Sequence, residues 1–461
     1  MTTTDFERLD VPLQAADLLR LHRRYPKRYP CLLESAALGG KARYDLLLGF
    51  PQSGLRLDAD GLTRDFDGVV HSGRFLDVLD RQWRAACVPQ ASAMPYIGGW
   101  ALYLGYELLA QIEPRVATRP APAGLPVALA LRCPVALIHD RANGSICAVL
   151  EADAAQADWR RQLGEDIAAL TSPGVSEPTD TLPGLHIDED DPEPFLRGVR
   201  RIHEYLRAGD VFQVNLSRGW QASAREPLSH DVVYAALRRA NPAPFAGLLA
   251  WDDWAILSSS PERLISVRDG LAETRPIAGT RPRRPNDPAD DVSRLAELIG
   301  HPKERAEHVM LIDLERNDLG RVCVPGSVQV DELMALESYA HVHHIVSNVR
   351  GRLRPEVSPG QAIAATFPGG TITGCPKIRC MQIIHELESV GRGPYTGALG
   401  YLDRRGDLDL NILIRTLWMR DNRLHFRAGA GVVIDSDPVA ELAETRAKAR
   451  GLLRALGVQA V

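Results

Sequence analysis

The sequence lacks the marks of several protein classes. Its seven cysteines are scattered, odd in number and never spaced as C-x-x-C, which disfavours a disulfide framework or a zinc site and favours a reducing cytosol. The most apolar run, residues 125–138, is too short to span a bilayer and is interrupted by Arg132 and Pro134. The N-terminus has neither the basic nor the apolar region of a signal peptide. We therefore expect a soluble, cytoplasmic protein that does not enter a membrane.

An excess of positive charge is also missing. The chain has 54 Lys and Arg residues against 59 Asp and Glu residues, a formal charge of −5. A nucleic-acid-binding protein usually has a basic excess, so no nucleic-acid partner is expected. An anionic substrate must instead be held by local cations, helix N-termini or a metal. No nucleophile elbow of the G-x-S-x-G or G-x-C-x-G type occurs, so we do not expect a glutaminase triad within this chain.

The chain is long enough for one large domain or two to three ordinary ones. Residues 171–193, rich in Pro, Gly, Ser and acidic residues, predict an exposed linker between an N-terminal region, 1–170, and a C-terminal region, 194–461. Short apolar stretches predict strands at 45–50, 127–131, 135–138 and 145–150. Helical composition and apolar spacing predict helices at 158–170 and 195–208.

Residues 211–217 alternate as a strand does, with Gln213, Asn215 and Ser217 on one face. A polar face of this kind meets either solvent or a binding site. Solvent is the more frequent explanation, because half-exposed strands are common.

Two segments contain a Glu-x-x-Glu pattern, Glu304 with Glu307 and Glu441 with Glu444. At this spacing both carboxylates of a pair project from one helix face, and carboxylate oxygens suit Mg²⁺. A solvated acidic face is the more frequent explanation for one isolated pair. The metal interpretation requires that the two helices face each other across a site.

Residues 367–379 (FPGGTITGCPKIR) form a glycine-rich turn before a predicted helix, either an anion cradle or simply a turn. Arg415 lies in an apolar run, 411–417, that predicts a strand. A buried arginine needs a partner: either a bound carboxylate, gripped by two hydrogen bonds, or an internal acidic residue.

Three histidines, His341, His343 and His344, follow one another closely, but no further ligand completes a zinc site. The alternative is that one of the three histidines forms a hydrogen bond or transfers a proton in a site. Glu262 follows a Ser-Pro turn beside an apolar run, and is equally a candidate general acid and a salt-bridge partner.

Together these segments resemble the chorismate-utilising enzymes, a family that includes anthranilate synthase large subunits, aminodeoxychorismate synthase component I, isochorismate synthases and salicylate synthases. The resemblance is strong over residues 195–456 and weaker before the linker, where LLES matches. The matching blocks are FQVNLS, SSSPERL, RPIAGTRPR, ERAEHVMLIDLERNDLGRV, VHHIVS, FPGGTITGCPKIR, YTGALGY, NILIRT and AGAGVV. The resemblance implies an α/β (α+β) fold of the anthranilate-synthase type, with two packed antiparallel sheets, outer helices and a central cleft.

The resemblance also implies a Mg²⁺ cofactor that holds the ring carboxylate of chorismate. Glu307 and Glu444 are similar to the family's metal ligands, with Glu304 and Glu441 in support through water. Chorismate itself would be bound by a further set: the side chains of Arg415, Tyr395, Lys448 and Thr371, and the backbone of Gly429, Ala430 and Gly431.

His344 and Glu262 resemble the groups near the departing C4 hydroxyl of chorismate, with Glu262 the better candidate for general acid. Isochorismate and salicylate synthases carry a lysine base at the position of Gln213; glutamine cannot activate water, so an aminating enzyme is implied. Aminodeoxychorismate synthases usually have lysine at the position of Ala278, whereas anthranilate synthases have alanine. The blocks FQVNLS, SSSPER, DLERND, GGTITG and NILIRT resemble the aminodeoxychorismate group more closely.

Three hypotheses follow. The first is an aminodeoxychorismate synthase component I, which makes 4-amino-4-deoxychorismate for 4-aminobenzoate and folate with ammonia from a class I glutaminase subunit. The second is an anthranilate synthase component I, and the third is a non-catalytic partner that regulates a glutaminase. The resemblance further implies a tryptophan-like ligand between the N-terminal and C-terminal parts, at the segments LLES and NPAPF.

Overall fold

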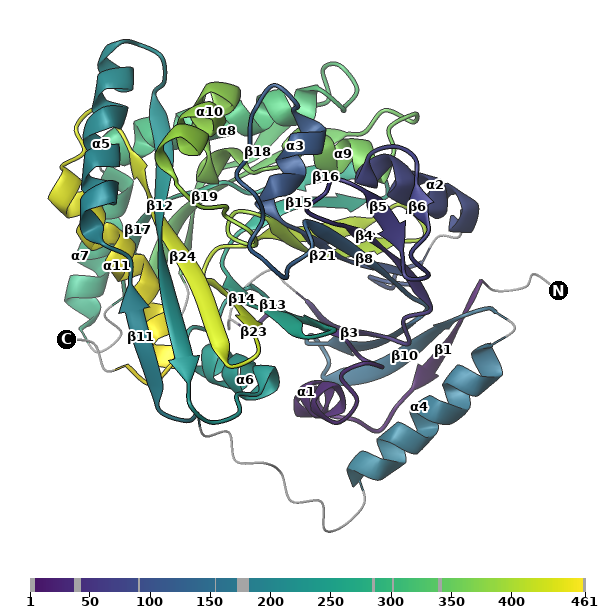
Figure 1. Cartoon of the computed structure of the whole chain (residues 1–461). Helices are drawn as coiled ribbons and strands as arrows, with labels where there is room; N and C mark the ends of the chain where they lie inside the picture. The colour runs from purple at the N-terminus through teal and green to yellow at the C-terminus, as the bar shows by residue number, and fades with distance from the viewer. Residues whose placement is uncertain are drawn as a thin grey trace.

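The computed structural model describes residues 5–36, 43–89, 92–153, 155–171, 182–283, 287–300, 302–338 and 342–458. Within these ranges the chain forms two antiparallel sheets, each of 12 strands (Figure 1). The expected fold class, two packed antiparallel sheets with outer helices, is confirmed.

Neighbouring strands of the first sheet are, in order, β1 (Phe6–Asp10), β10 (Ser145–Glu151), β9 (Val135–Asp140), β3 (Tyr44–Gly49), β2 (Cys31–Glu34), β13 (Phe245–Trp251), β14 (Trp254–Ser260), β23 (Thr416–Arg420), β24 (Arg423–Val432), β12 (Gln213–Ala224) and β11 (Leu185–Glu189), with β20 (Gly374–Cys375) beside β12. Those of the second are β17 (Ile277–Pro282), β19 (Val342–Arg352), β16 (Leu271–Thr274), β15 (Arg263–Arg268), β22 (Leu408–Ile412), β21 (Ala398–Asp403), β7 (Gly99–Leu104), β8 (Ala128–Cys133), β4 (Ser53–Leu57), β5 (Thr63–Asp65) and β6 (Val70–His71), with β18 (Gln329–Ser338) beside β19.

Both sheets combine strands from before and after the predicted linker, so neither region has a sheet of its own. The four predicted N-terminal strands are confirmed as β3, β8, β9 and β10. Part of the predicted linker is a strand, β11, which pairs with β12. β11 lies at the edge of the sheet and has only two apolar residues, Leu185 and Ile187, among polar ones. Its composition therefore resembles that of a loop, which is why the sequence did not predict a strand. Residues 172–181 lie outside the described ranges.

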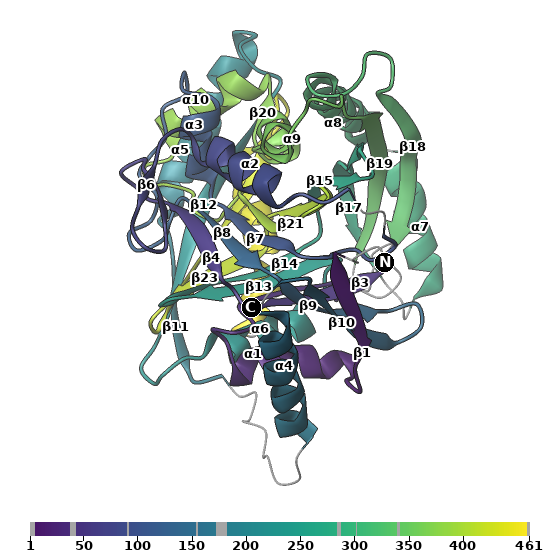
Figure 2. The same ribbon diagram turned by 90° about the vertical axis from the view of Figure 1, so that its right-hand side faces the viewer.

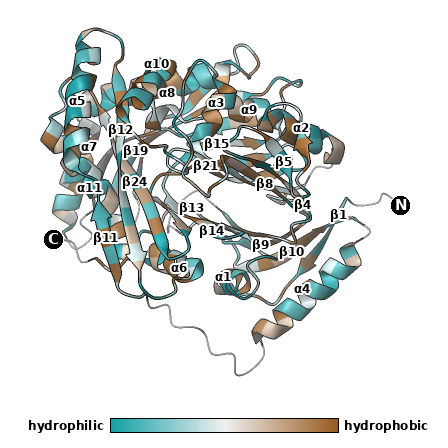
Figure 3. Ribbon diagram, in the orientation of Figure 1, coloured by the Kyte–Doolittle hydropathy of each residue, from teal (hydrophilic) through white to brown (hydrophobic). Residues whose placement is uncertain are grey.

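Helices cover the outer face of each sheet (Figures 1 and 2). The core outside the first sheet includes residues of α1 (Ala15–Arg24), α4 (Gln156–Thr171), α6 (His230–Ala240) and α11 (Pro438–Ala455). The core outside the second includes residues of α2 (Phe75–Ala86), α8 (Pro302–Gly320) and α9 (Pro359–Thr366). A third core fills the space between the sheets, and the strands there are coloured mainly as hydrophobic in Figure 3.

The remaining helices are α5 (Pro192–Arg207) and α10 (Lys377–Leu387), which share a core with β12 and β24, the short η1 (Tyr106–Leu108), α3 (Leu109–Ile112) and η2 (Gly370–Ile372), and α7 (Pro288–Gly300). The start of α11 follows from its sequence, because Asp437 accepts a hydrogen bond from the Ala440 amide at 2.9 Å and Pro438 occupies the first turn. No helix within the described ranges is long and apolar enough to cross a membrane.

Strand β12 corrects the expectation of a solvated polar face. Val214 and Leu216 are buried against α5 and α10, whereas Phe212, before the strand, is 66% exposed. Gln213, Asn215 and Ser217 on the opposite face are also buried. The polar face of this strand therefore lines the interior of the protein, where polar groups need partners.

Candidate functional site

Two of the expected residues lie where the chain passes from one sheet to the other. Glu262 separates β14 of the first sheet from β15 of the second, and Arg415 separates β22 of the second from β23 of the first. Backbone hydrogen bonds join the two crossings, from the Ile412 amide to the Glu262 carbonyl at 3.0 Å and from the Ser259 amide to the Arg415 carbonyl at 3.1 Å.

The prediction of one strand over residues 411–417 is therefore wrong. Both ends of the run contribute buried apolar side chains, but to different sheets, and composition does not reveal the break between them. Arg415 itself has φ 53°, a left-handed conformation that is rare for a side-chain-bearing residue and that frequently marks functional sites.

Glu262 is a carboxyl group removed from water. It is 6% exposed, and the Thr371 hydroxyl donates to its Oε1 at 2.6 Å. Burial raises the pKa of Glu262 to about 7, although the Thr371 hydrogen bond and the charge of Lys448 act in the opposite direction. A large fraction of Glu262 is protonated at neutral pH, so this side chain can donate a proton.

Arg415 is a partly buried cation whose donors are not used by an internal acid. Within the described ranges its guanidinium forms no hydrogen bond and no salt bridge, so the alternative of an internal ion pair is not found there. Burial lowers its pKa, while nearby Tyr395 and Glu444 favour the charged form. Arginine nevertheless stays charged at neutral pH, and its planar fork matches a carboxylate.

The glycines of β24 lie at a free edge of that strand. β24 pairs with β12 as far as Val432, but its pairing with β23 ends at Phe426. Beyond Phe426, therefore, the other edge of β24 has no strand beside it in the described part of the chain. A Cβ atom on Gly429 would lie 2.5 Å from Tyr395 Oη, and one on Gly431 would lie 2.7 Å from Gln213 Nε2. At residue 429 the backbone carbonyl oxygen of Leu216 would also lie 2.7 Å from that Cβ, so only glycine fits there, whereas at residue 431 the Gln213 side chain would have to move.

The side chain of Ala430, between these glycines, belongs to the core shared by α5 and α10. The expectation for Ala430 concerned its backbone, and the backbone remains part of the free edge. Gln213 and Tyr395, by contrast, reach the same face of the strand pair as the two glycines.

Tyr395 is held by a buried network that sequence reasoning missed. Glu388 accepts hydrogen bonds from Arg392 Nη2 at 2.7 Å and from Ser217 Oγ at 2.8 Å, and Arg392 lies 5.4 Å from the Tyr395 ring centre. Although burial opposes ionisation, Arg392 and Arg427 keep the pKa of Glu388 below its usual range. Burial raises the pKa of Tyr395 to about 12, so its phenol is a neutral donor. The only signal of this network in the sequence was the spacing of Glu388 and Arg392, an acidic and a basic residue four positions apart just before the block YTGALGY.

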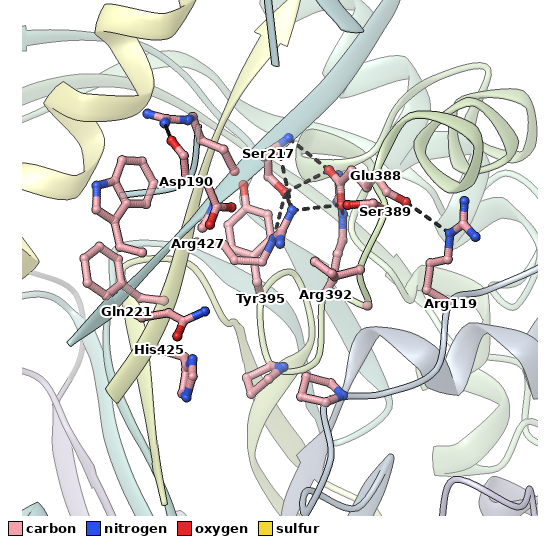
Figure 4. A pocket seen from close by; sticks show the side chains of 18 of the residues that line it. Arg119, Asp190, Ser217, Gln221, Glu388, Ser389, Arg392, Tyr395, His425 and Arg427 are labelled. Atoms are coloured by element: carbon pink, nitrogen blue, oxygen red, sulfur yellow. Dashed lines mark hydrogen bonds and ion pairs between the residues drawn. The ribbon is translucent and has the colours of Figure 1, made fainter. Parts of the chain in front are cut away.

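A cavity of about 810 Å³ reaches this network (Figure 4). Strands β12, β23 and β24 form one wall, and residues 119–123 and 387–395 contribute the other. Figure 4 shows Ser217, Tyr395, Arg392 and Arg427 gathered at one side of it. Tyr395 belongs both to the cavity wall and to the surroundings of Arg415 and Gly429.

His344 is buried on β19 and lies near Arg415. Burial lowers the pKa of His344 to about 4, so its imidazole is neutral at neutral pH and can act as a hydrogen-bonding group. His343 instead contacts Asp291 at 3.0 Å, and His341 lies outside the described residues. Ala278 is in β17, where its backbone pairs with Ile345 of β19.

The four glutamates lie on two helices that pack against different sheets, α11 against β24 and α8 against β17 and β19. Glu444 forms an ion pair with Lys448 at 2.7 Å and its charge acts on Arg415. Glu441 accepts a hydrogen bond from Ser436 at 2.5 Å. On α8, Glu304 forms an ion pair with Arg281 at 2.7 Å, and Glu307 is partly buried.

Within the described ranges no group of three or more His, Cys, Asp or Glu side chains is arranged to hold a metal ion. Mg²⁺ commonly uses one or two protein carboxylates, with water and substrate oxygens as its other ligands. The hard carboxylate oxygens of Glu307 and Glu444 fit that donor set.

The glycine-rich turn contributes Thr371 to the site. The turn forms η2, and Thr371 within it reaches Glu262. The following helix, α10, begins at Lys377 and lines a separate groove together with Phe212 and Ile378.

The structure thus brings Glu262, Thr371, Lys448, Glu444, Arg415, Tyr395 and His344 into one connected cluster, with Gly429, Gly431 and Gln213 beside Tyr395. A buried proton donor, an available guanidinium and a strand edge without a neighbouring strand together suit an anionic substrate that loses a hydroxyl group.

Known proteins resemble this chain in sequence and in fold. The model of the chorismate binding enzyme family matches residues 56–454. An anthranilate synthase component I-like protein of Synechocystis is 43% identical over 79% of this chain and 73% of its own length. Aminodeoxychorismate synthase component 1 of Bacillus subtilis is 50% identical, over 57% of this chain and 55% of its own. The crystal structure of anthranilate synthase component I from Streptococcus pneumoniae superposes with a TM-score of 0.80 and 32% identity, covering 90% of this chain and 93% of that one.

Proposed function

The chain belongs to the chorismate-binding enzyme family, and on that premise we propose that it replaces the C4 hydroxyl of chorismate with an amino group, giving 4-amino-4-deoxychorismate for 4-aminobenzoate and folate synthesis. The observation that carries amination is Gln213, an amide packed against Gly431 beside the cluster, and the choice of C4 is supported by sequence blocks such as FQVNLS and NILIRT, which resemble the aminodeoxychorismate group. An amide takes no proton at neutral pH, so water at this position has no base to activate it. Ammonia needs no such base, because it is itself a nucleophile.

Substrate binding would use the cations and donors at the crossing of the sheets. Arg415 offers two parallel N–H donors to a carboxylate, Tyr395 adds a neutral O–H, and the free edge of β24 adds backbone groups at Gly429 and Gly431. Glu307 and Glu444 would hold Mg²⁺, with Glu304 and Glu441 in support through water; its charge would neutralise the ring carboxylate.

Glu262 would act as the general acid. Its proton passes to the C4 hydroxyl as the C4–O bond breaks, so the group leaves as water and Glu262 becomes a carboxylate. The lone pair of ammonia forms the new bond at C4, so the nitrogen is bound as an ammonium group whose charge balances that carboxylate. His344, neutral at neutral pH, would position the hydroxyl by a hydrogen bond, and Thr371 would orient the Glu262 carboxyl. Because residue 278 is alanine, no side-chain amine forms a covalent adduct with the ring, and ammonia attacks the substrate directly.

Ammonia would come from a separate class I glutaminase subunit through the cavity that ends at Tyr395. The cavity supports this route because its lining includes both Val390, which is 55% exposed at the protein surface, and Tyr395, one member of the cluster. Val390→Arg should lower the rate with glutamine and the glutaminase while leaving the rate with ammonium salt unchanged. Equal loss of both rates, or of neither, would contradict this route.

A second candidate is anthranilate synthase component I, which adds nitrogen at C2 and removes pyruvate. Ala278 is the observation that favours it, since anthranilate synthases resemble this chain at that position. A third, a non-catalytic partner of a glutaminase, would be eliminated by Mg²⁺-dependent consumption of chorismate.

Product analysis tests the proposal. Pure protein is incubated with chorismate, Mg²⁺ and an ammonium salt, with and without aminodeoxychorismate lyase, and the products are separated by chromatography with fluorescence detection. The appearance of 4-aminobenzoate only with the lyase supports amination at C4. Anthranilate without the lyase would instead establish the second candidate.

The proposal extends to a tryptophan-like regulator. A cavity of about 320 Å³ lies between Glu34 and Ser35 of the LLES segment and Pro244 and Phe245 of NPAPF, and these segments supply both polar and aromatic groups. Calorimetry with tryptophan should detect binding. Absence of both binding and any effect on the rate would refute this extension.

A further inference from the structure

Arg392 is a buried cation to which the proposed mechanism gives no role. It is 2% exposed, although an arginine in water is charged and well hydrated. An arginine side chain has five N–H donors, and Arg392 makes five hydrogen bonds. Two of them, from Nε at 2.9 Å and from Nη2 at 2.7 Å, go to the two carboxylate oxygens of Glu388. All five donors are occupied, so the guanidinium has none to offer a substrate.

One of the other three hydrogen bonds fixes the turn that carries Thr371. Arg392 Nη1 donates to the Ile372 carbonyl, in η2, at 3.2 Å. Thr371, the preceding residue, donates its hydroxyl to Glu262 Oε1 at 2.6 Å. Because Thr371 and Ile372 are adjacent in one short turn, displacement of the Ile372 carbonyl would move the Thr371 hydroxyl relative to the Glu262 carboxyl.

A second hydrogen bond holds the backbone beside Tyr395. Arg392 Nη1 also donates to Thr396 Oγ1 at 3.3 Å, and this hydroxyl donates to the Tyr395 carbonyl at 2.5 Å. Thr396 has φ 66°, a left-handed conformation that is rare for a β-branched residue and persists only where neighbouring contacts impose it. Arg392, which lies beside the Tyr395 ring in Figure 4, supplies one of these contacts.

The third hydrogen bond connects both segments to β12. Arg392 Nη2 donates to the Asn215 carbonyl at 2.8 Å, and the Asn215 amide donates to the carbonyl of Thr373, directly after η2, at 3.0 Å. Asn215 is also paired with Gly431 of β24. One guanidinium therefore joins η2, the Tyr395 segment and the β12–β24 strand pair, and each of these three parts carries a residue of the cluster or lies beside it.

We propose that Arg392 is a positioning residue for the amination of chorismate, which holds the Thr371 hydroxyl against the Glu262 carboxyl and Tyr395 against a substrate carboxylate. It acts through these residues, because its own donors are all occupied. The inference rests on the proposed function, in which Glu262 is the general acid and Tyr395 binds the substrate.

Arg392→Lys tests the inference, because lysine keeps a positive charge beside Glu388 but has three donors instead of five and no planar fork. We expect the hydrogen bonds to Ile372 and Thr396 to be lost. The kcat should then fall on the order of ten- to a hundredfold, the effect of a small misplacement of a catalytic group, and KM for chorismate should rise as Tyr395 loosens.

The pH profile separates positioning from a general loss of stability. A hydroxyl that donates to a carboxylate stabilises its charged form. Loss of the Thr371 contact should therefore leave Glu262 protonated up to a higher pH, so the alkaline decline of the rate in Arg392→Lys should move to higher pH. A decline at the pH of the wild type would overturn the inference.

A double-mutant cycle with Thr371→Val identifies the route of the effect. Thr371→Val removes the hydroxyl and should by itself move the alkaline decline to higher pH. In the Thr371→Val background, Arg392→Lys should add no further movement, since the group through which it acts is already gone. A movement of the same size with and without the Thr371 hydroxyl would overturn the inference.

Arg405→Lys is the matched control, in the turn between β21 and β22. Arg405 also pairs with a carboxylate, Asp403 Oδ1 at 2.7 Å, and donates to the carbonyls of Ser92 at 2.8 Å and Met94 at 2.9 Å. Its side chain is 8% exposed. Arg405→Lys should leave kcat, KM and the pH profile unchanged. An equal movement of the alkaline decline in this control would show a general effect of losing a buried arginine and would overturn the inference.

Glu388→Asp serves as a second variant if Arg392→Lys does not fold. It keeps the ion pair but shortens the acid by one methylene, which draws the guanidinium away from the Ile372 carbonyl. The alkaline decline should again move to higher pH, and an unmoved decline in this variant would refute the positioning role.

Infrared titration of Glu262 distinguishes failure of this inference from failure of the proposed function. The carboxyl signal lost in Glu262→Gln identifies Glu262, and in Arg392→Lys, or in Glu388→Asp, that signal should titrate at higher pH without any turnover. An unshifted titration would overturn the inference even if the enzyme aminates chorismate. Failure of the wild type to consume chorismate would instead refute the proposed function, and the infrared shift would still decide whether Arg392 acts on Glu262 through η2.

Discussion

Replacing Glu262 by glutamine should lower activity and, in alkaline solution, make the protein more stable. The carboxyl is buried and its pKa is about 7 in the folded protein, against an ordinary value of 4.5. A carboxyl whose pKa is raised by folding contributes most to stability below its unfolded pKa, and that contribution is lost as pH rises through its folded pKa. Glutamine is neutral at every pH and avoids this loss.

The gap between the two pKa values corresponds to about 3 kcal/mol of unfolding free energy at about pH 8. At about pH 5 most of the folded protein and much of the unfolded chain carry a protonated Glu262, so the advantage of glutamine should shrink to about 1 kcal/mol. The same substitution removes the proposed general acid, and a loss of about 10²- to 10⁴-fold in kcat is expected.

Urea unfolding of the wild type and Glu262→Gln at both pH values measures the difference. Asp313→Asn, at a side chain that is 63% exposed, is a surface control that should show no dependence of this kind. The reasoning predicts a stabilisation that grows with pH. An equal effect at both pH values, or a destabilisation in alkaline solution, would show that Glu262 is not a carboxyl held protonated by burial.

Four further predictions follow from the same geometry. At constant free ammonia, the rate should decline as pH rises through about 7, because Glu262 loses its proton; a profile that stays flat in alkaline solution would contradict this. Glu444→Ala and Glu307→Ala should abolish Mg²⁺-dependent turnover with little change in melting temperature, since Glu444 is exposed and Glu307 only partly buried, and near-normal rates at saturating substrate would refute the metal assignment. Arg415→Lys should raise KM for chorismate about tenfold, because lysine keeps the charge but loses the two-pronged donor; an unchanged KM would exclude the carboxylate contact. Ala278→Lys tests regiochemistry, with intact mass reporting whether an aminodeoxychorismate-forming enzyme traps its substrate on the new lysine.

The regular parts of the fold follow from local patterns. Alternation and short apolar runs predicted β3, β8, β9 and β10, and apolar spacing predicted α5, because buried faces repeat with the period of the strand or the helix. β11 was missed, since an edge strand needs few apolar residues. The break at Arg415 was missed because both of its flanks are buried, in different sheets.

The sequence alone determined the residue types available for chemistry and, through the ordered blocks, the family to which the chain belongs. Only the tertiary structure decided what those residues experience. It buries the polar face of β12, brings Thr371 to Glu262 and leaves the Arg415 donors unused within the described chain. Neighbours distant in sequence exclude water from Glu262, and a pKa depends on that local exclusion rather than on the order of residues along the chain.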